Sequence, residues 1–132
     1  MAKIGYVIVC EEVFNDNGDA IIKKPYNVIT PYSIPGNFSL VLAFSMFDLE
    51  TNIQYKLNIE IIQPDNTTLI EQIMDFDFSP PPEQISNSLA SGGINLKFNN
   101  ILFKQEGMHT FKITINGQSF NEIMIPVYPS GQ

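Results

Sequence analysis

The sequence contains no arginine and no tryptophan, and it has only one cysteine and one histidine. Its 7 basic residues, all lysines, stand against 14 acidic residues, so the net charge at pH 7 is −7. Nucleic-acid binding needs cations clustered against the phosphates, and this composition cannot supply a large basic surface. We therefore expect no nucleic-acid partner. An acidic surface favours instead a protein partner with a basic surface.

The shortage of cysteine and histidine limits the chemistry further. Cys10 cannot form an intrachain disulfide, and its apolar neighbours over 6–10 predict a buried thiol. A zinc site needs several histidine or cysteine ligands, and no glycine-rich phosphate loop is present, so we expect no metal and no cofactor. The chain has no apolar run of about 18 residues and no secretory signal after Lys3, which predicts no membrane partner and a cytoplasmic protein.

Hydrophobic side chains recur at every second position, which is typical of strands with one buried face. The clearest example alternates Tyr55, Leu57, Ile59 and Ile61 with polar residues. Strands are predicted over 4–14, 38–46, 54–61, 69–78, 94–103, 110–115 and 120–127. The segment 94–103 is predicted to contain a bulge at 99–100. No amphipathic helical stripe of about 12 residues is present.

Turn-forming residues separate these strands. Residues 15–18 predict a hairpin, and Asn116-Gly117 predicts a two-residue primed turn in which both residues have positive φ. Three prolines place 23–36 at an edge or in a crossover, and 79–93 reads as a long proline-rich loop whose middle can form a short helix. We predict a single domain over 1–132, an all-β antiparallel sandwich, immunoglobulin-like, with about seven to nine strands.

No catalytic residues are predicted, and we expect a protein that is not an enzyme. His109 begins a late strand where immunoglobulin-like sandwiches carry a corner tyrosine, which favours a structural role. As a general base it would need a nucleophile or a partner acid that the sequence does not mark. Asp75 and Asp77 share one strand face at roughly 6.5–7 Å, as glycosidase carboxylates do, but a solvated face opposite the apolar side chains of the strand explains them better.

The last predicted strand carries the best candidate for a binding surface. If Ile123 and Ile125 face the core, the alternate side chains face outward, and an exposed Phe and Met beside an acid resemble a partner surface. In the alternative, a second sheet or the long loop covers them. Apolar residues of that loop either provide this cover or anchor a partner. The candidate protein-binding residues are Pro80, Pro81, Ile85, Leu89, Phe120, Glu122 and Met124.

These patterns favour a non-catalytic protein-binding module. One specific form is an acidic inhibitor or accessory protein from bacteria, a phage or another mobile element, which binds a basic protein surface. Sandwich edges carry unpaired backbone groups, so a homo-oligomer formed by edge pairing is a second mode of association. The alternative function is a small-ligand or carbohydrate-binding sandwich, for which a cleft lined by Tyr26 and Tyr32 would be needed.

The opening strand over 4–11 is followed by a turn and a proline-containing segment, and then by a long Phe/Leu-rich strand. The closing stretch over 102–113 leads into Asn116-Gly117 and a final strand. In this order of features, over nearly the whole chain, the sequence resembles a family of small uncharacterised bacterial proteins, a domain of unknown function. It departs from the family pattern in having His109 where tyrosine is usual. The resemblance implies an immunoglobulin-like sandwich and brings no catalytic residues.

Overall fold

The computed structural model describes residues 2–17, 19–50, 53–77 and 89–131, with the backbone alone for 89–91. The described residues form strands and no helix, and none of them therefore provides a helix that could cross a membrane. The strands are β1 (Lys3–Asp16), β2 (Asp19–Pro25), β3 (Gly36–Glu50), β4 (Gln54–Ile62), β5 (Thr68–Asp77), β6 (Leu89–Phe103), β7 (Gly107–Ile115) and β8 (Ser119–Val127).

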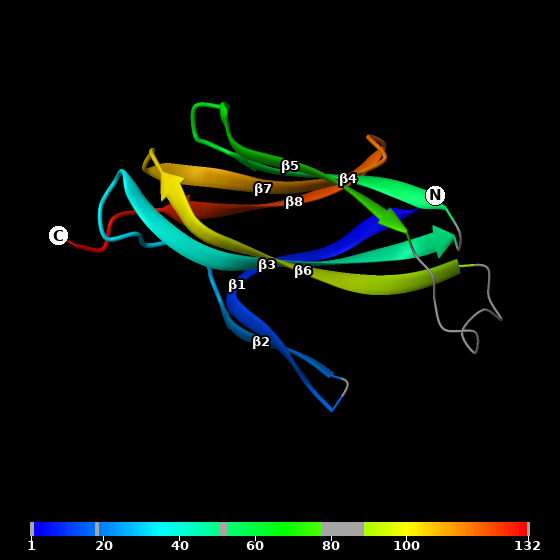
Figure 1. The fold of residues 1–132 in the computed structure, drawn as a ribbon. Coiled ribbons are helices and arrows are strands. Elements are labelled where there is room, and N and C mark those ends of the chain that lie inside the picture. Colours follow the sequence, from blue (N-terminus) through cyan, green and yellow to red (C-terminus); the bar gives the residue numbers. More distant parts are fainter. Residues whose placement is uncertain (1, 18, 51–52, 78–88, 132) are drawn as a thin grey trace.

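The strands form two four-stranded sheets packed face to face (Figure 1). One sheet has the order β2-β1-β3-β6, and the other has the order β5-β4-β7-β8. Neighbouring strands are antiparallel in both sheets. The predicted all-β antiparallel sandwich is therefore confirmed, while its immunoglobulin-like variant stays a prediction.

The core lies between the two sheets and follows the alternation of the sequence. In β4 the side chains of Tyr55, Leu57, Ile59 and Ile61 are all buried. They pack in one cluster with buried residues of the opposite sheet, such as Phe44. Each well-buried aliphatic or aromatic side chain contributes about 1.5–3 kcal/mol through removal of apolar surface from water. The core is thus assembled from strands that are distant in sequence.

The predicted turns and the predicted bulge are present, with one difference. Asn116 and Gly117 have φ angles of 53° and 65°, as a primed turn requires. The connection is nevertheless one residue longer than predicted, because Ile115 pairs with Ser119. In β6 the bulge lies at Asn100, whose φ is 55° and whose backbone N–H donates to Ser39 Oγ at 2.9 Å.

The predicted loop over 79–93 is wrong at its C-terminal end. The backbone of β6 begins at Leu89, and Gly92 and Gly93 pair with Met46 and Ser45 of β3. The local sequence predicts a loop at these glycines, but β3 extends to Glu50 and offers them a pairing partner. The predicted short helix lies outside the described residues. A further strand, β2, forms an edge as far as Pro25, and the chain then crosses to β3.

Candidate functional site

Strand β8 presents large apolar side chains to solvent. Its core side carries Ile125 and Val127, both buried, so the alternate residues point away from the sandwich. Phe120 is 55% exposed and Met124 is 63% exposed, and Glu122 lies exposed between them. The predicted orientation of these three candidate residues is therefore confirmed, and the second sheet does not cover them.

The neighbouring strand β7 adds two residues that the sequence analysis did not select. Lys112 pairs in register with Glu122, and its Nζ lies 4.3 Å from the centroid of the Phe120 ring, a cation–π contact. Met108 is also exposed on this side. We call the group Met108, Lys112, Phe120, Glu122 and Met124 the β8 face. Lys112 and Met108 belong to a different strand from the other three residues. Only the register of β7 with β8 therefore shows that they lie on the same face.

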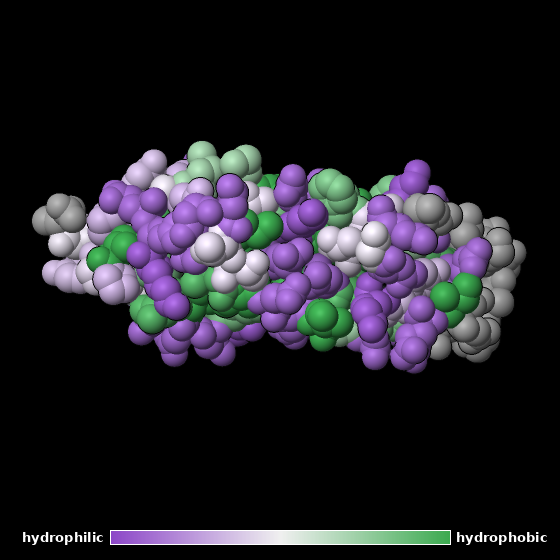
Figure 2. Space-filling model, turned by 90° about the horizontal axis from the view of Figure 1, so that it is seen from above, coloured by the Kyte–Doolittle hydropathy of each residue, from purple (hydrophilic) through white to green (hydrophobic). Residues whose placement is uncertain are grey.

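The outer side of this whole sheet is acidic. Residues in register show that five acids and two lysines point outward, which gives a formal charge of 2 − 5 = −3. Figure 2 views the molecule from this side and shows hydrophobic side chains as separate islands among hydrophilic ones. The outward-facing charged residues are Lys56, Glu60, Glu71, Asp75, Asp77, Lys112 and Glu122.

The edge of β8 that does not pair with β7 already makes hydrogen bonds at several backbone groups. At its C-terminal end, the N–H of Ile29 donates to Pro126 O at 2.9 Å, and Tyr128 N–H donates to Ile29 O at 3.0 Å. Farther along, the Asn121 side chain accepts from Glu122 N–H at 2.9 Å and donates to Gly5 O of β1 at 2.6 Å. Addition of a strand at this edge would break these bonds. A partner can reach the β8 face from above without breaking any of them.

The other candidate residues are not gathered at this face. Pro80, Pro81 and Ile85 lie outside the described residues, and Leu89 belongs to β6 as backbone alone. Tyr26 packs its ring edge-on against Phe38 at 5.3 Å, while Tyr32 stands exposed elsewhere. Neither of the two described pockets is lined by Tyr26 or Tyr32. These two pockets of the described part of the chain therefore do not supply the cleft between Tyr26 and Tyr32 that the carbohydrate-binding alternative needs.

His109 is sealed inside the sandwich. Its side chain is 0% exposed, its Nδ1 lies 3.0 Å from Gly107 O, and its ring packs edge-on against Phe103. Because a carbonyl oxygen only accepts, Nδ1 carries the proton and Nε2 is left without a hydrogen-bond partner among the described residues. A substrate cannot reach this ring. The contacts agree with the structural role expected from the sequence.

Burial of His109 predicts a pH-dependent stability. Desolvation lowers the pKa of the His109 imidazole below its usual value, although the Gly107 carbonyl works in the opposite direction. The unfolded chain therefore takes up this proton first, near pH 6.5, and the free energy of unfolding decreases as the pH falls below that value. Urea unfolding between pH 8 and pH 5.5 measures the decrease. His109→Phe should flatten the profile in this range, and an equal slope in both proteins would contradict the assignment.

The remaining titratable candidates have ordinary structural explanations. Cys10 is buried, its Sγ lies 3.7 Å from Glu12 O and Val41 O, and burial raises the pKa of its thiol. A raised pKa opposes thiolate formation, so Cys10 is an inert core residue. Asp75 and Asp77 are exposed on the outer side of β5, as a solvated face requires.

Comparison with known protein families places this chain in one family. A family of unknown function (DUF6941) matches residues 5–128. The chain belongs to this family, and the sandwich described above covers nearly all of the matched segment. A search of curated proteins finds no match to the chain.

Proposed function

We propose that this protein is a non-catalytic module that binds another protein through the β8 face. The observation that carries the proposal is the exposure of Phe120 and Met124 on an ordered strand whose other side is buried in the core. Binding hot spots are typically such anchors, surrounded by polar groups. Glu122 lies between the two anchors and supplies a charge that orients a partner.

Charge selects the kind of partner. The outer side of the sheet has a formal charge of −3 over its outward-facing residues, and the chain has a net charge of −7. A second copy of this surface would be repelled, whereas a basic surface would be attracted and steered. The partner therefore presents lysine or arginine around an apolar patch. Because an acidic protein carries the same sign of charge as nucleic acid, it competes with nucleic acid for the basic surface of a host protein.

Several finer points belong to the same proposal. We place the protein in the cytoplasm of a bacterium, where it acts as an inhibitor or accessory protein. It is encoded by the bacterium, by a phage or by another mobile element. The sandwich is taken to be immunoglobulin-like. Edge pairing of two copies is a secondary mode, restricted to edges other than β8 because Ile29 and Asn121 occupy that one.

The double variant Phe120→Ser/Met124→Ser tests the β8 face. Both side chains are exposed, so the free energy of unfolding should change by less than about 0.5 kcal/mol per substitution. Loss of two central anchors should weaken binding at least about 100-fold. A tagged protein first isolates its partner from bacterial lysate at physiological salt, and the dissociation constant is then measured with the purified partner.

Ile73→Ser is the matched control. Ile73 is 59% exposed and faces outward on β5, at the opposite edge of the same sheet. This variant should bind the partner within about threefold of the unchanged protein, since it lies outside the proposed contact. If the double variant binds as tightly as the control, the β8 face is not the binding surface. If the unchanged protein retains no partner, the proposed class of function is wrong.

A further inference from the structure

The hairpin of β1 and β2 projects from the sandwich (Figure 1). Strand β1 pairs with β3 only as far as Cys10, and beyond that residue it pairs with β2 alone. We call residues 11–17 and 19–25 the arm, and every side chain in it is exposed or half-buried. A hairpin of two strands alone is at best marginally stable in water, whereas three or more strands with an apolar face are stable. Further strands would therefore stabilise the arm.

The arm carries apolar side chains on both of its faces. Phe14 pairs in register with Ile21, and Val13 pairs with Ile22, so one apolar pair lies on each face. Phe14 is 43% exposed and Ile21 is 38% exposed. None of the four belongs to the core cluster of the sandwich or packs against it. Apolar side chains of another molecule would remove these pairs from water.

The outer edge of β2 is open to another strand. Strand β2 is the last strand of its sheet. In the part of the chain that the structure describes, the backbone of residues 19–24 makes no backbone hydrogen bond outside the ladder with β1. Pro25 has no N–H group and ends this edge. Residues 19–24 thus offer backbone donors and acceptors to a strand from another molecule.

The charges of β2 distinguish it from the other strand edges. Asp19 lies at one end of β2, and Lys23 and Lys24 lie at the other. A second copy of β2 in antiparallel orientation reverses this order, so that acid and lysine meet at both ends. The edge of β1 in the arm has acids at both ends, β5 carries only acids, and the single charged residue of β6 is Lys97. Among the described edges that remain unbonded, β2 is therefore the one whose charges attract a second copy.

The backbone restricts the register of such a pairing. Backbone groups of alternate residues point to the same edge of a strand, so 19, 21 and 23 form one set, and 20 and 22 belong to the other. Two copies that pair through the same edge must oppose residues of the same set. Among the registers that remain, the one centred on Ile21 places Asp19 opposite Lys23. Ile21 then lies opposite Ile21 of the second copy.

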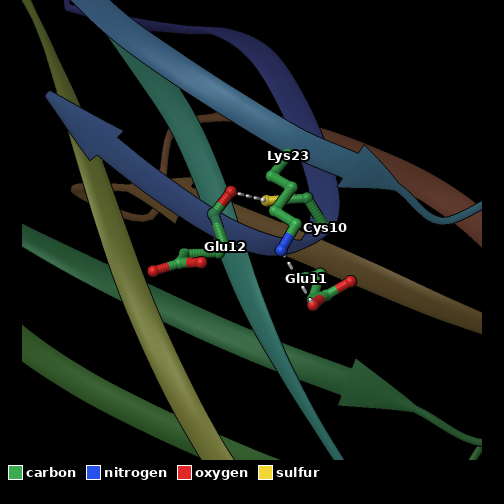
Figure 3. Close-up of polar contacts among 4 residues, drawn as sticks. All are labelled: Cys10, Glu11, Glu12 and Lys23. Atoms are coloured by element: carbon green, nitrogen blue, oxygen red, sulfur yellow. Dashed lines mark hydrogen bonds and ion pairs between the residues drawn. The ribbon is translucent and has the colours of Figure 1, made fainter. Parts of the chain in front are cut away.

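We infer that two copies of this chain pair through β2, in antiparallel orientation about a twofold axis at Ile21. The two arms become one four-stranded sheet, and one face of it carries a row of Phe14 and Ile21 from each copy. An ion pair between Asp19 and Lys23 lies on each side of the row. Lys23 Nζ already lies 3.6 Å from Glu11 Oε1 (Figure 3), but its side chain is 55% exposed and can bind a second carboxylate.

This inference rests on the edge pairing proposed above and specifies its strand and register, and it does not depend on the β8 face. The net charge of −7 opposes association of two copies. The acidic outer side, however, belongs to the other sheet, which lies roughly 10 Å farther away. Physiological salt screens exposed charges over about 8 Å, so the nearby charges of the two β2 strands dominate.

Self-association of the purified protein tests the inference without any other partner. Analytical ultracentrifugation at physiological salt should show a monomer–dimer equilibrium with a dissociation constant on the order of 10–100 μM, because a single short strand pairs. Ile21→Lys opposes two lysines at the axis and should weaken dimerisation at least about tenfold. Ile73→Lys makes the same change on the exposed outer side of β5 and should not alter it. A protein that stays monomeric at millimolar concentration, or equal dimerisation of the two variants, overturns the inference.

Charge reversal identifies the paired residues. Asp19→Lys and Lys23→Asp each place like charges opposite one another, so each should weaken dimerisation at least about tenfold. An equimolar mixture of the two variants should form a heterodimer about as tightly as the unchanged protein dimerises, because every lysine then lies opposite an aspartate. Circular dichroism confirms that each variant is folded. Unchanged dimerisation of the folded single variants, or a mixture that stays monomeric, contradicts the pairing of Asp19 with Lys23.

Cysteine crosslinking tests the register without a change of charge. Ile21→Cys places two thiols opposite each other at a Cα separation of about 4.5–5.5 Å, which suits a disulfide. In Ile22→Cys the two Cα atoms lie roughly 8 Å apart, which is too far. Cys10 is buried and does not compete. After mild oxidation, a covalent dimer should form with Ile21→Cys and not with Ile22→Cys, and any other result contradicts the register.

The double variant Phe120→Ser/Met124→Ser separates this inference from the proposed function. Both residues lie on the other sheet, so the variant should dimerise as the unchanged protein does even if it no longer binds the protein partner. Conversely, Ile21→Lys should still bind that partner through the β8 face. Loss of dimerisation in the double variant would show that the β8 face, and not β2, joins the two copies.

Discussion

Replacing Leu57 by aspartate is expected to unfold the protein. Leu57 lies in the middle of β4, is 0% exposed and pairs with strands on both sides, Met74 of β5 and Ile115 of β7. The substitution removes about 1.5–3 kcal/mol of apolar burial and places a carboxyl group in a site with no partner. Together these costs exceed about 5 kcal/mol, which is comparable with the whole free energy of unfolding of a typical domain.

Circular dichroism and urea unfolding measure this effect against two reference variants. Leu57→Ala should remain folded and lose about 2–5 kcal/mol, because it creates a cavity without burying a charge. Ile73→Asp makes the same kind of change on the solvent side of β5 and should cost less than about 0.5 kcal/mol. A cooperative unfolding transition for Leu57→Asp at the original urea midpoint would show that β4 faces the other way.

A methyl group added at Gly36 is expected to destabilise the protein by about 1–3 kcal/mol. Gly36 opens β3 at the end of the crossover and pairs with Phe103. A Cβ atom built there would overlap the carbonyl oxygen of Ser33 and would press on Pro31 at 3.3 Å. A backbone carbonyl cannot rotate aside as a flexible side chain does. The Gly36→Ala substitution must therefore displace the crossover, which also supports β8 through Ile29.

Gly93→Ala provides the matched control in the same sheet. A Cβ at Gly93 would meet the Tyr6 hydroxyl at 3.5 Å and the Phe44 carbonyl oxygen at 3.8 Å, which are ordinary contacts. Because alanine restricts the unfolded chain more than glycine does, this variant should be neutral or slightly more stable. The two urea midpoints are compared directly. If Gly36→Ala matched Gly93→Ala, the close approach of the crossover to β3 would be refuted.

The two outer sides of the sandwich differ in shape and composition. The outer side of β4, β5, β7 and β8 is acidic with apolar anchors, which suits a basic protein partner. The outer side of β1, β3 and β6 carries a groove whose lining is mainly polar. The closed edge of β8 directs a partner onto the face of the sheet, and leaves edge pairing to other strands.

The hairpin of β7 and β8 differs from the sequence prediction in the length of its turn. The sequence predicted inward side chains at Ile113 and Ile115 and also at Ile123 and Ile125. A two-residue turn at 116–117 would pair residue 115 with residue 118 and would turn Phe120 into the core. The structure buries Ile113, Ile115 and Ile125 and packs the partly buried Ile123 against the core. It adds Gln118 to the connection, so that Ile115 pairs with Ser119. Burial of the apolar side chains decided the register against the preferred turn length.

The prediction of a loop over 79–93 is wrong at its C-terminal end for a related reason. Glycine and serine over 91–93 are typical of loops when judged locally, yet β3 presents backbone groups opposite them. Pairing satisfies those groups and extends β6 to Leu89. The hairpin predicted at 15–18 is formed by β1 and β2, although residues 19–25 are not among the segments predicted as strands. Pairing with β1, which continues past Cys10, gives these residues their strand conformation.

The sequence by itself determined which side chains face the core, where the chain turns and where β6 bulges. These are local properties, because alternation and positive φ depend on neighbouring residues alone. Only the tertiary structure decided which strands lie side by side, and with what register. Lys112 beside Phe120, and Glu12 and Lys97 in the lining of one groove, arise from pairings between segments distant in sequence. Such pairings depend on the combined burial of two sheets, which no single stretch of the chain contains.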